Sequence, residues 1–397
     1  MFNFVFDRCV SGRPYPNLAP LSDVSDGYHN MGNQYPWIAP LRLMYYVDQH
    51  QYPINVIYLD ADTVLPSHSF YPVGLAFFDY SIDYFAMLSS EVKSRCLAGE
   101  LKILFYYHEG DNPHYEKSRL DGLCQAHALS TDCYRFVSGN TQADHIPGFV
   151  YFADHELFYW RNAVVRNGQN VPGCEPHARP RSRQFTLLSR IHKWWRATIV
   201  ACLHRDKLLD HSYWSYGSVD IGDRPEDNPI ELWPFDIDHY LHEFLSHAPY
   251  RCDDLTSDQH NAHYMLVPQH FEDSYCHLVL ETFFDAEQSN GTFLTEKTFK
   301  PIRQAQPFVV FGTPNSLATL RSLGYRTFDQ YIDNSYDQEL NNTERFKLLM
   351  SAVKKLHGQD LHSWYQQCLE DVIHNQNLFL SPKYDRLNTL YHKLLDK

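Results

Sequence analysis

The segment Gly291–Gly312, GTFLTEKTFKPIRQAQPFVVFG, contains the most informative group of polar residues in the chain. A loop leads through Thr295, Glu296 and Lys297 into a predicted helix, and the apolar run PFVVFG predicts a buried strand. Free N–H groups at a helix start with a lysine beside them favour a diphosphate, and a neighbouring carboxylate can accept two ribose hydroxyls. The alternative is a capped surface helix with a solvated Glu–Lys pair.

The start of this helix has two candidate caps, because Thr295 and Thr298 both have a side-chain oxygen that can accept a backbone N–H. If Thr298 is the cap, Pro301 falls at the third helical position, in the first turn. A proline costs little there, because the N–H that it lacks has no partner within the helix.

The T-E-K run, the helix and the strand PFVVFG resemble the donor-site segment of the fucosyltransferase-like families of the GT-B fold, and exostosin-like transferases have a related layout. The resemblance implies that Glu296 holds the nucleotide ribose and Lys297 reaches the diphosphate, with Thr295 in the same site. The continuation GTPNSLATLRSLGYRTFDQYID, followed by SYDQEL, is similar to sugar transferases of phages and bacteria, so the likeness covers roughly residues 185–375. Fucosyltransferases often place an acidic or aromatic residue before T-E-K, where this chain has GTFL, so the resemblance leaves the donor sugar open.

The segment Phe185–Ser218 supplies basic residues that could contact the same ligand. A strand ends at Ser189-Arg190, and the following helix should bury a stripe formed by Ile191, Trp195, Ile199 and Cys202. Arg196 lies away from that stripe, and the resemblance implies that it contacts phosphate, with Arg190 as a partner. The planar guanidinium matches phosphate oxygens in pairs. A solvated basic helix face is the alternative.

Carboxylates follow several predicted strands, where ligand sites of parallel sheets lie. Glu281 ends the strand HLVL and is expected to contact the donor or to cap the next loop. Asp60 and Asp62 form a D-x-D after the strand NVIYL, the pattern of metal-dependent GT-A transferases, or a simple strand-end turn.

The loop after the strand KILFYY is the candidate for the catalytic base. An inverting transferase needs a group that takes the proton of the acceptor hydroxyl. Glu109 fits that position, and the resemblance also implies a glutamate in a comparable loop. His108 and Asp111 are its rivals.

Apolar runs alternate with helical patterns in both halves of the chain, which predicts parallel α/β sheets. In the first half we expect strands at Asn55–Leu59, Lys102–Tyr107, Tyr134–Val137 and Phe149–Phe152, and helices at Tyr80–Ala98 and Tyr115–Leu129. In the second half we expect strands at Phe185–Leu188, Tyr213–Tyr216, His277–Leu280 and Pro307–Gly312, helices at Ile191–His204, Ile237–His247 and Ser316–Leu323, and almost only helix from Asn342 onward.

Residues 164–184 hold several Gly, Pro and Arg with little apolar periodicity, which is typical of a linker. We therefore predict an acceptor-binding domain at 1–170, a linker at 171–184, a donor-binding domain at 185–340 and C-terminal helices at 341–397 that return to the first domain. The expected fold class is α/β, with two Rossmann-like domains facing a cleft, the GT-B arrangement.

The composition is that of an acidic globular protein, with a formal net charge of −14 and 44% hydrophobic residues. The negative charge disfavours nucleic acid as a partner, because phosphate contacts dominate that affinity. Nine irregularly spaced cysteines without a C-x-x-C pair indicate buried thiols in a reducing compartment. We find no signal-peptide pattern and no apolar run near the roughly 20 residues of a membrane span, so we expect a cytoplasmic protein.

These residues and the resemblance together predict a hexosyl- or fucosyl-type glycosyltransferase that moves a sugar from a nucleotide sugar to a hydroxyl acceptor such as a glycan. Inversion at the anomeric carbon is implied by the resemblance alone. The nucleotide sugar is a cosubstrate, and we expect neither a metal nor another cofactor. The alternatives are a metal-dependent GT-A-type enzyme that uses Asp60 and Asp62, and a glycan-binding protein without catalysis.

Overall fold

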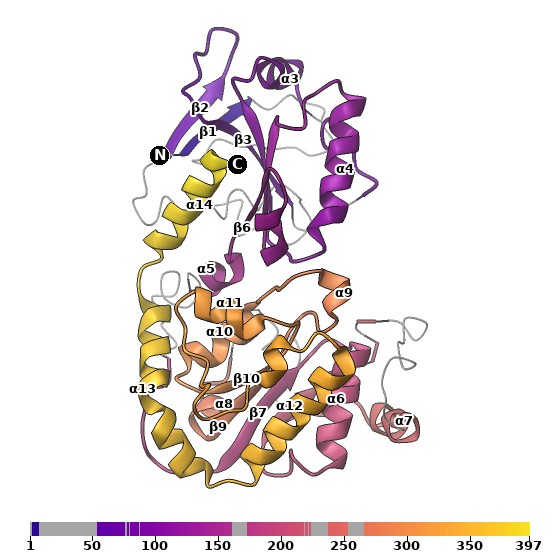
Figure 1. Ribbon diagram of the computed structural model, residues 1–397, viewed down its shortest axis with the longest axis vertical. Coiled ribbons are helices and arrows are strands. Elements are labelled where there is room, and N and C mark those ends of the chain that lie inside the picture. Colours follow the sequence, from indigo (N-terminus) through magenta and orange to yellow (C-terminus); the bar gives the residue numbers. More distant parts are fainter. Residues whose placement is uncertain are drawn as a thin grey trace. The chain divides into compact units, whose positions relative to one another are not determined.

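The computed structural model describes residues 2–7, 54–75, 78, 80–86, 88–160, 173–217, 219–220, 222–223, 237–252 and 266–397. The chain divides into two compact units, each built on a parallel sheet (Figure 1). The first unit comprises Met1–His155, Ser289–Gly291 and Pro382–Lys397, and the second comprises Glu156–Gln288 and Thr292–Ser381. The predicted α/β class with parallel sheets is confirmed.

The sheet of the first unit has the strand order β2-β1-β3-β4-β5-β6, and its strands pair in parallel. The strands are β1 (Phe2–Asp7), β2 (Ile54–Leu59), β3 (Ser69–Leu75), β4 (Lys102–Tyr107), β5 (Tyr134–Ser138) and β6 (Phe149–Tyr151). The helices of this unit are α3 (Ser90–Leu97), α4 (Pro113–Ala126), the 3-10 helix η1 (Thr141–His145) and α14 (Tyr384–Asp396). Helix α5 (Asp154–Trp160) begins in the first unit and continues into the second.

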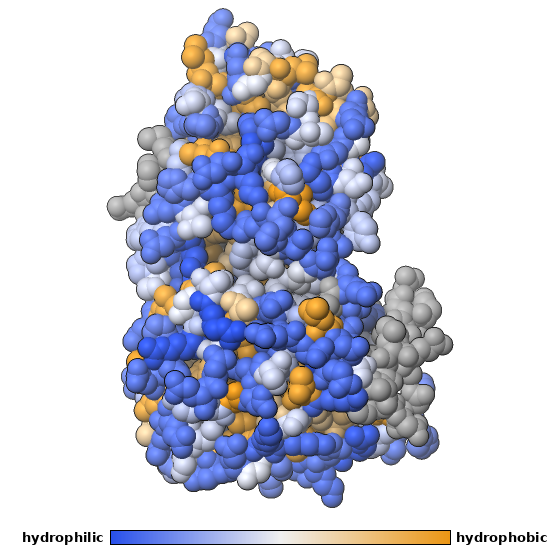
Figure 2. Space-filling model, in the orientation of Figure 1, coloured by the Kyte–Doolittle hydropathy of each residue, from blue (hydrophilic) through white to orange (hydrophobic). Residues whose placement is uncertain are grey.

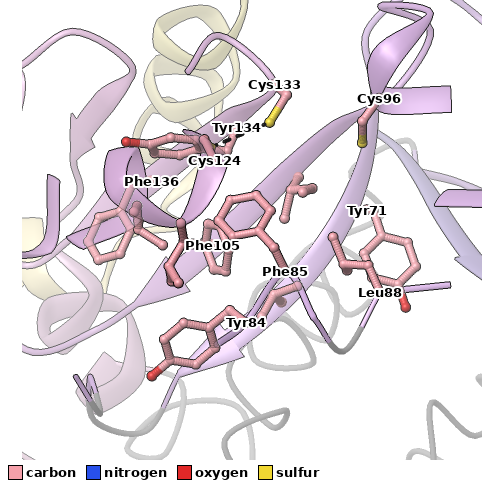
Figure 3. Packing of buried hydrophobic residues seen from close by; sticks show 14 of the residues in the cluster. Tyr71, Tyr84, Phe85, Leu88, Cys96, Phe105, Cys124, Cys133, Tyr134 and Phe136 are labelled. Carbon is pink, nitrogen blue, oxygen red and sulfur yellow. Dashed lines mark hydrogen bonds between the residues drawn. The ribbon is translucent and has the colours of Figure 1, made fainter. Parts of the chain in front are cut away.

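Aromatic rings fill the core between this sheet and helices α3 and α4 (Figure 3). Phe105 makes edge contacts with Tyr84, Phe85 and Tyr134, and Phe136 stacks on Phe149 with ring centroids 4.5 Å apart. Edge-to-face and stacked pairs add to the free energy of burial because they match the charge distribution of the rings. The high aromatic content of the sequence therefore serves the core of this unit.

Helix α14 completes the first unit, although it is the last helix of the chain. The ring of Tyr391 meets the ring of Phe2 edge-on at 5.0 Å between centroids. The ammonium of Lys393 lies 2.5 Å from a carboxylate oxygen of Asp144. The two ends of the described chain are thus parts of one unit.

The sheet of the second unit has the order β10-β9-β7-β8, again with parallel pairing. The strands are β7 (Arg183–Ser189), β8 (Tyr213–Tyr216), β9 (Ser274–Leu280) and β10 (Phe308–Phe311). The helices are α6 (Trp194–Arg205), α7 (Asp238–Ser246), α8 (Pro268–Glu272), α9 (Ala286–Ser289), α10 (Glu296–Arg303), α11 (Ser316–Ser322), the 3-10 helix η5 (Ser335–Gln338), α12 (Asn342–His357) and α13 (Leu361–Leu380). Right-handed connections place α6 and α10 on opposite faces, because β8 and β10 lie on opposite sides of the β7–β9 pair.

Two strands of the first sheet lack the expected sequence signals. β1 is only a short apolar run, and β3 (SFYPVGL) contains Pro72 and Gly74, which are poor strand formers. The pairing of β3 with β1 covers Ser69 and Phe70 and ends before Pro72. The proline is therefore compatible with the central position of β3.

The helix predicted for Tyr80–Ala98 is wrong in its first half, because α3 begins only at Ser90. The carboxylate of Asp83 accepts the backbone N–H groups of Phe85 and Ala86 and forms a separate turn. Ser89 then caps α3 by accepting the N–H of Val92.

The predicted linker is partly outside the described residues, which resume at 173. Its described part is bound to the second unit. Cys174 donates its backbone N–H to Gln304 at 2.9 Å, and the guanidinium of Arg181 donates to the carbonyl oxygens of Phe271 and Ser274. Hydrogen bonds to a buried side-chain amide and to main-chain carbonyls hold this segment, in contrast to the free connector that its composition predicts.

Hydrophilic residues cover most of the described surface on the face shown in Figure 2, and hydrophobic residues lie there in small separate groups. None of the described helices combines the length and the apolar character that crossing a lipid bilayer requires. The cysteines Cys96, Cys124, Cys133, Cys174, Cys202, Cys276 and Cys368 are buried free thiols.

Replacing Phe105 by alanine should lower the free energy of unfolding of the first unit by roughly 3–5 kcal/mol, because it leaves a cavity among the surrounding rings. The measurement is urea unfolding followed by near-ultraviolet circular dichroism. Tyr115→Ala is the matched control, because that ring is 64% exposed on α4. A cost for Phe105→Ala as small as that of the control would contradict the packing described above.

Candidate functional site

The second sheet has a topological switch point between β7 and β9. The chain passes from β7 through α6 to β8 on one side, and from β9 through α10 to β10 on the other. Ligands of open parallel sheets bind outside the carboxyl ends of the strands where the order reverses in this way. The residues that follow β7 and β9 therefore form the candidate site.

Two lysines from opposite sides of the switch point meet at Thr282, two residues after the end of β9. The ammonium of Lys193, at the start of α6, donates to the carbonyl oxygen of Thr282 at 3.1 Å. The ammonium of Lys297, on α10, donates to the hydroxyl of Thr282 at 3.2 Å and to that of Thr295 at 3.0 Å. The fold thus gathers positive charge at the carboxyl edge of the sheet in a chain whose net charge is −14.

Glu281 is buried, with 1% of its surface exposed, and its carboxylate occupies the start of α10. One oxygen accepts the backbone N–H of Thr295 and the hydroxyl of Thr298, and the other accepts the N–H of Thr282 and the hydroxyl of Thr295. A buried carboxylate requires such compensation. Of the two sequence interpretations of Glu281, the capping contact is the one present in this structure.

The structure resolves the choice of helix cap, because α10 begins after Thr295 and the hydroxyl of Thr295 accepts the N–H of Lys297. Thr298 lies in the first turn and donates its hydroxyl to Glu281. Pro301 is therefore inside the helix and not at its third position. It lacks the N–H that would bond to the carbonyl of Lys297, and the helix ends two residues later, at Arg303.

Arg196 lies beneath this site. It is 3% exposed, and its guanidinium donates to the carbonyl oxygen of Glu281 and to that of Ile191. Burial lowers its pKa. Trp195, Ile199 and Cys202 of the expected stripe are buried, whereas Ile191 precedes the helix, which begins at Trp194. Burial extends over all residues from Trp194 to Leu203, so Arg196 has no solvated face. In this structure Arg196 holds the end of β9 in position.

Arg190 follows β7 and is exposed. Gly217, after β8, lies so close that an added Cβ would stand 1.7 Å from the carbonyl oxygen of Arg190. Only glycine allows the two loops to approach in this way. Their contact fixes the main chain of Arg190 at the switch point.

Lys300 is a site residue that the sequence interpretation missed. Its side chain is partly buried, and burial together with the charges of Lys297 and Arg190 lowers its pKa to about 8, against the opposing effect of Glu296. Lys300 stands three residues after Lys297 and four after Glu296, so helical spacing alone places the three side chains on one face. The ammonium of Lys297 lies 3.5 Å from a carboxylate oxygen of Glu296.

The first unit carries the candidate base, Glu109, in the loop after β4. Its carboxylate lies 3.3 Å from the imidazole of His108, and its side chain is 37% exposed. The hydroxyl of Tyr107 donates to the carboxylate of Asp111 in the same loop. All three predicted groups, His108, Glu109 and Asp111, therefore lie at the carboxyl end of a central strand.

The D-x-D pair, Asp60 and Asp62, follows β2 and is exposed. The carboxylate of Asp60 accepts the N–H of Asp62 and the hydroxyl of Thr63, which is the pattern of a strand-end turn. Within the described part of the chain, we find no group of three or more His, Cys, Asp or Glu side chains placed to hold a metal ion.

A cavity of about 490 Å³ lies between α6 and α12, with Phe346, Met350 and Cys202 among its lining residues. Its basic side chains are paired with carboxylates. Lys354 binds Asp206 at 2.7 Å and Lys347 binds Glu344 at 2.6 Å. The cavity is distant in the fold from the ends of β7 and β9, because it involves the last turn of α6, and its charges are already compensated.

Sequence comparisons add no family assignment: no protein-family model matches the chain, and no curated protein matches it either.

Replacing Glu281 by glutamine should destabilise the second unit by about 1.5–3 kcal/mol for each donor that loses its charged acceptor. The amide would have to turn its NH₂ group toward one pair of donors, each of which includes a backbone N–H. Urea unfolding would measure the change, with Glu287→Gln at an exposed position of α9 as the control. Equal stability of the two variants would show that the carboxylate does not hold α10 in place.

Proposed function

We propose that this protein is a glycosyltransferase of the GT-B kind that transfers a sugar from a nucleotide-sugar donor to a hydroxyl acceptor. The observation that carries the proposal is the cationic group around Thr282 at the switch point of the second sheet. A diphosphate is the ligand that this group suits best, because it presents several anionic oxygens to several fixed donors.

The charges around the site support a donor that leaves as a diphosphate. Lys193, Lys297 and Lys300 outnumber the nearby carboxylate of Glu296, and Glu281 is already saturated with hydrogen bonds. When the bond to the sugar breaks, negative charge grows on the departing diphosphate, and fixed cations stabilise it. Electrostatic stabilisation by these residues is the contribution that the second unit makes to the reaction.

Glu296 completes the donor site in this proposal. Its carboxylate is only 7% exposed and lies beside Lys297, where it can accept hydrogen bonds from the ribose hydroxyls. Arg196 acts indirectly in this proposal, because its guanidinium binds the main chain of Glu281. The start of α10 is filled by the carboxylate of Glu281, so the diphosphate is bound by side-chain ammonium groups more than by the helix N-terminus.

Affinity for a nucleoside diphosphate should depend on pH through Lys300. Its pKa is about 8 in the free protein, and a bound anion raises that pKa. Above pH 8 binding must therefore take up a proton, and the dissociation constant should increase as the pH rises. The phosphates themselves are fully ionised there, because their last pKa is near 6. Calorimetry with UDP and GDP between pH 7 and 10 would measure this dependence.

Variants separate the roles of the charged groups. Lys300→Arg should keep its charge and lose the pH dependence, whereas Lys297→Ala should weaken UDP or GDP binding by about one to two orders of magnitude. Glu296→Ala should weaken nucleoside diphosphate binding and leave pyrophosphate binding nearly unchanged. Lys347→Met, on the far end of the unit, is the control. If Lys297→Ala and Lys300→Met bind UDP and GDP like the parent, the donor site is wrongly assigned.

A further inference from the structure

A carboxyl group in the first unit is buried without full compensation. Glu116, on α4, is 1% exposed, and its Oε2 has no hydrogen-bond partner among the described residues. Its Oε1 accepts a hydrogen bond from the hydroxyl of Tyr80 at 3.2 Å. An ionised carboxylate with so few hydrogen bonds costs free energy when it is buried, whereas the carboxylate of Glu281 accepts hydrogen bonds from several donors.

Burial raises the pKa of Glu116 to about 7, and the charge of Asp111 adds to that effect. A hydrogen bond from the backbone N–H of Glu116 and the one from Tyr80 oppose the rise in pKa. Burial and the same carboxylates raise the pKa of Tyr80, so its hydroxyl keeps its proton at neutral pH. Glu116 can therefore gain and lose a proton near neutrality, while Tyr80 stays a neutral donor.

The pair stands at the edge of the first sheet where ligands of parallel sheets bind. Tyr80 follows β3, Asp111 follows β4, and Glu116 lies in the first turn of α4, the helix that starts there. The charged and titratable groups that face Glu116 are Tyr80, from the segment after β3, and Asp111, from the loop after β4. The charge of Glu116 also raises the pKa of Tyr107 in β4. The ring of Tyr80 is 47% exposed, so it connects the buried carboxyl to the surface.

We propose that Tyr80 and Glu116 form a proton relay that deprotonates the acceptor hydroxyl, an inference that rests on the proposed transferase function. The oxygen of Tyr80 takes the proton of the acceptor as its own proton passes to Oε1 of Glu116. The acceptor oxygen then forms the new bond to the anomeric carbon, and the bond to the diphosphate breaks. Tyr80 ends the step neutral and Glu116 ends it protonated, and solvent later removes that proton.

The relay has an advantage over the exposed carboxylates nearby. A base works best when its pKa is close to the working pH, because it is then both ionised and basic enough to take a proton. Glu116 meets that condition, and it reaches the surface through one hydroxyl. Asp111 already accepts the hydroxyl of Tyr107, and Glu109 lies beside His108.

The test compares Tyr80→Phe, Glu116→Gln and Glu109→Gln with Tyr115→Phe, a neighbouring exposed tyrosine, as the control. Binding of UDP and GDP is measured first, and then release of nucleoside diphosphate from UDP- and GDP-hexoses with water or glucose as acceptor, from pH 5 to 9. Titration of the ¹³C-labelled glutamate carboxyls by NMR, with Glu116→Gln to assign the signal, reports the pKa of Glu116 without turnover.

We expect parent turnover to rise with pH through a limb near the pKa of Glu116, about 7. Glu116→Gln should remove that limb, and Tyr80→Phe should lower turnover by roughly a hundredfold or more while donor binding stays unchanged. Tyr80→Phe should also raise the pKa of Glu116, because it removes the bond that stabilises the carboxylate. Because Tyr80 is 47% exposed, Tyr80→Phe should leave the protein folded, so that a lower turnover reports the lost hydroxyl.

Three results would overturn the relay. The first is turnover in Tyr80→Phe equal to that in Tyr115→Phe, and the second is an unchanged pH limb in folded Glu116→Gln. The third is loss of the limb in Glu109→Gln alone. Each of these results would assign the uptake of the acceptor's proton to another group. Failure of the proposed function is distinguishable, because the parent would then bind neither UDP nor GDP and release neither from any hexose donor. That result would also contradict the proton relay, because the relay rests on the proposed transferase function.

Discussion

The buried carboxylate of Glu281 is the interaction on which the charged edge of the second sheet depends. It ties the end of β9 to the first turn of α10 through the backbone of Thr295 and the hydroxyl of Thr298. Arg196 of α6 binds the carbonyl of the same residue from the other side of the sheet. Because a buried charge is tolerated only where several donors converge, this one residue fixes two helices that carry the lysines.

The same rule explains the contrast between the two carboxyl groups at the sheet edges. Glu281 accepts four hydrogen bonds and is therefore locked in place. Glu116 has one oxygen, Oε2, without a partner among the described residues, and it can exchange a proton near neutral pH. Burial is nearly equal for both side chains, so the number of donors, and not depth, distinguishes a structural carboxylate from a reactive one.

The sequence predicts most strands of both sheets, because runs such as KILFYY and PFVVFG are apolar throughout and end in polar residues. It fails where one element contains unfavourable residues, as in β3 with Pro72, or where a side chain starts a local turn, as Asp83 does. The T-E-K segment locates the charged edge. It does not reveal that Glu281 fills the helix start, that Arg196 is buried or that Tyr80 meets Glu116, because these contacts join residues distant in sequence, whose distances follow only from the packed sheet.

The place of α14 in the first unit has a consequence for how the chain folds. The ring of Phe2 in β1 packs against the ring of Tyr391 in α14, although almost the whole described chain lies between them. Contacts between residues so far apart in sequence slow folding, because forming them costs the entropy of the long loop that they close. The second unit is encoded between these two segments. The contact between β1 and α14 therefore forms late in folding, and the first unit is complete only when α14 has joined it.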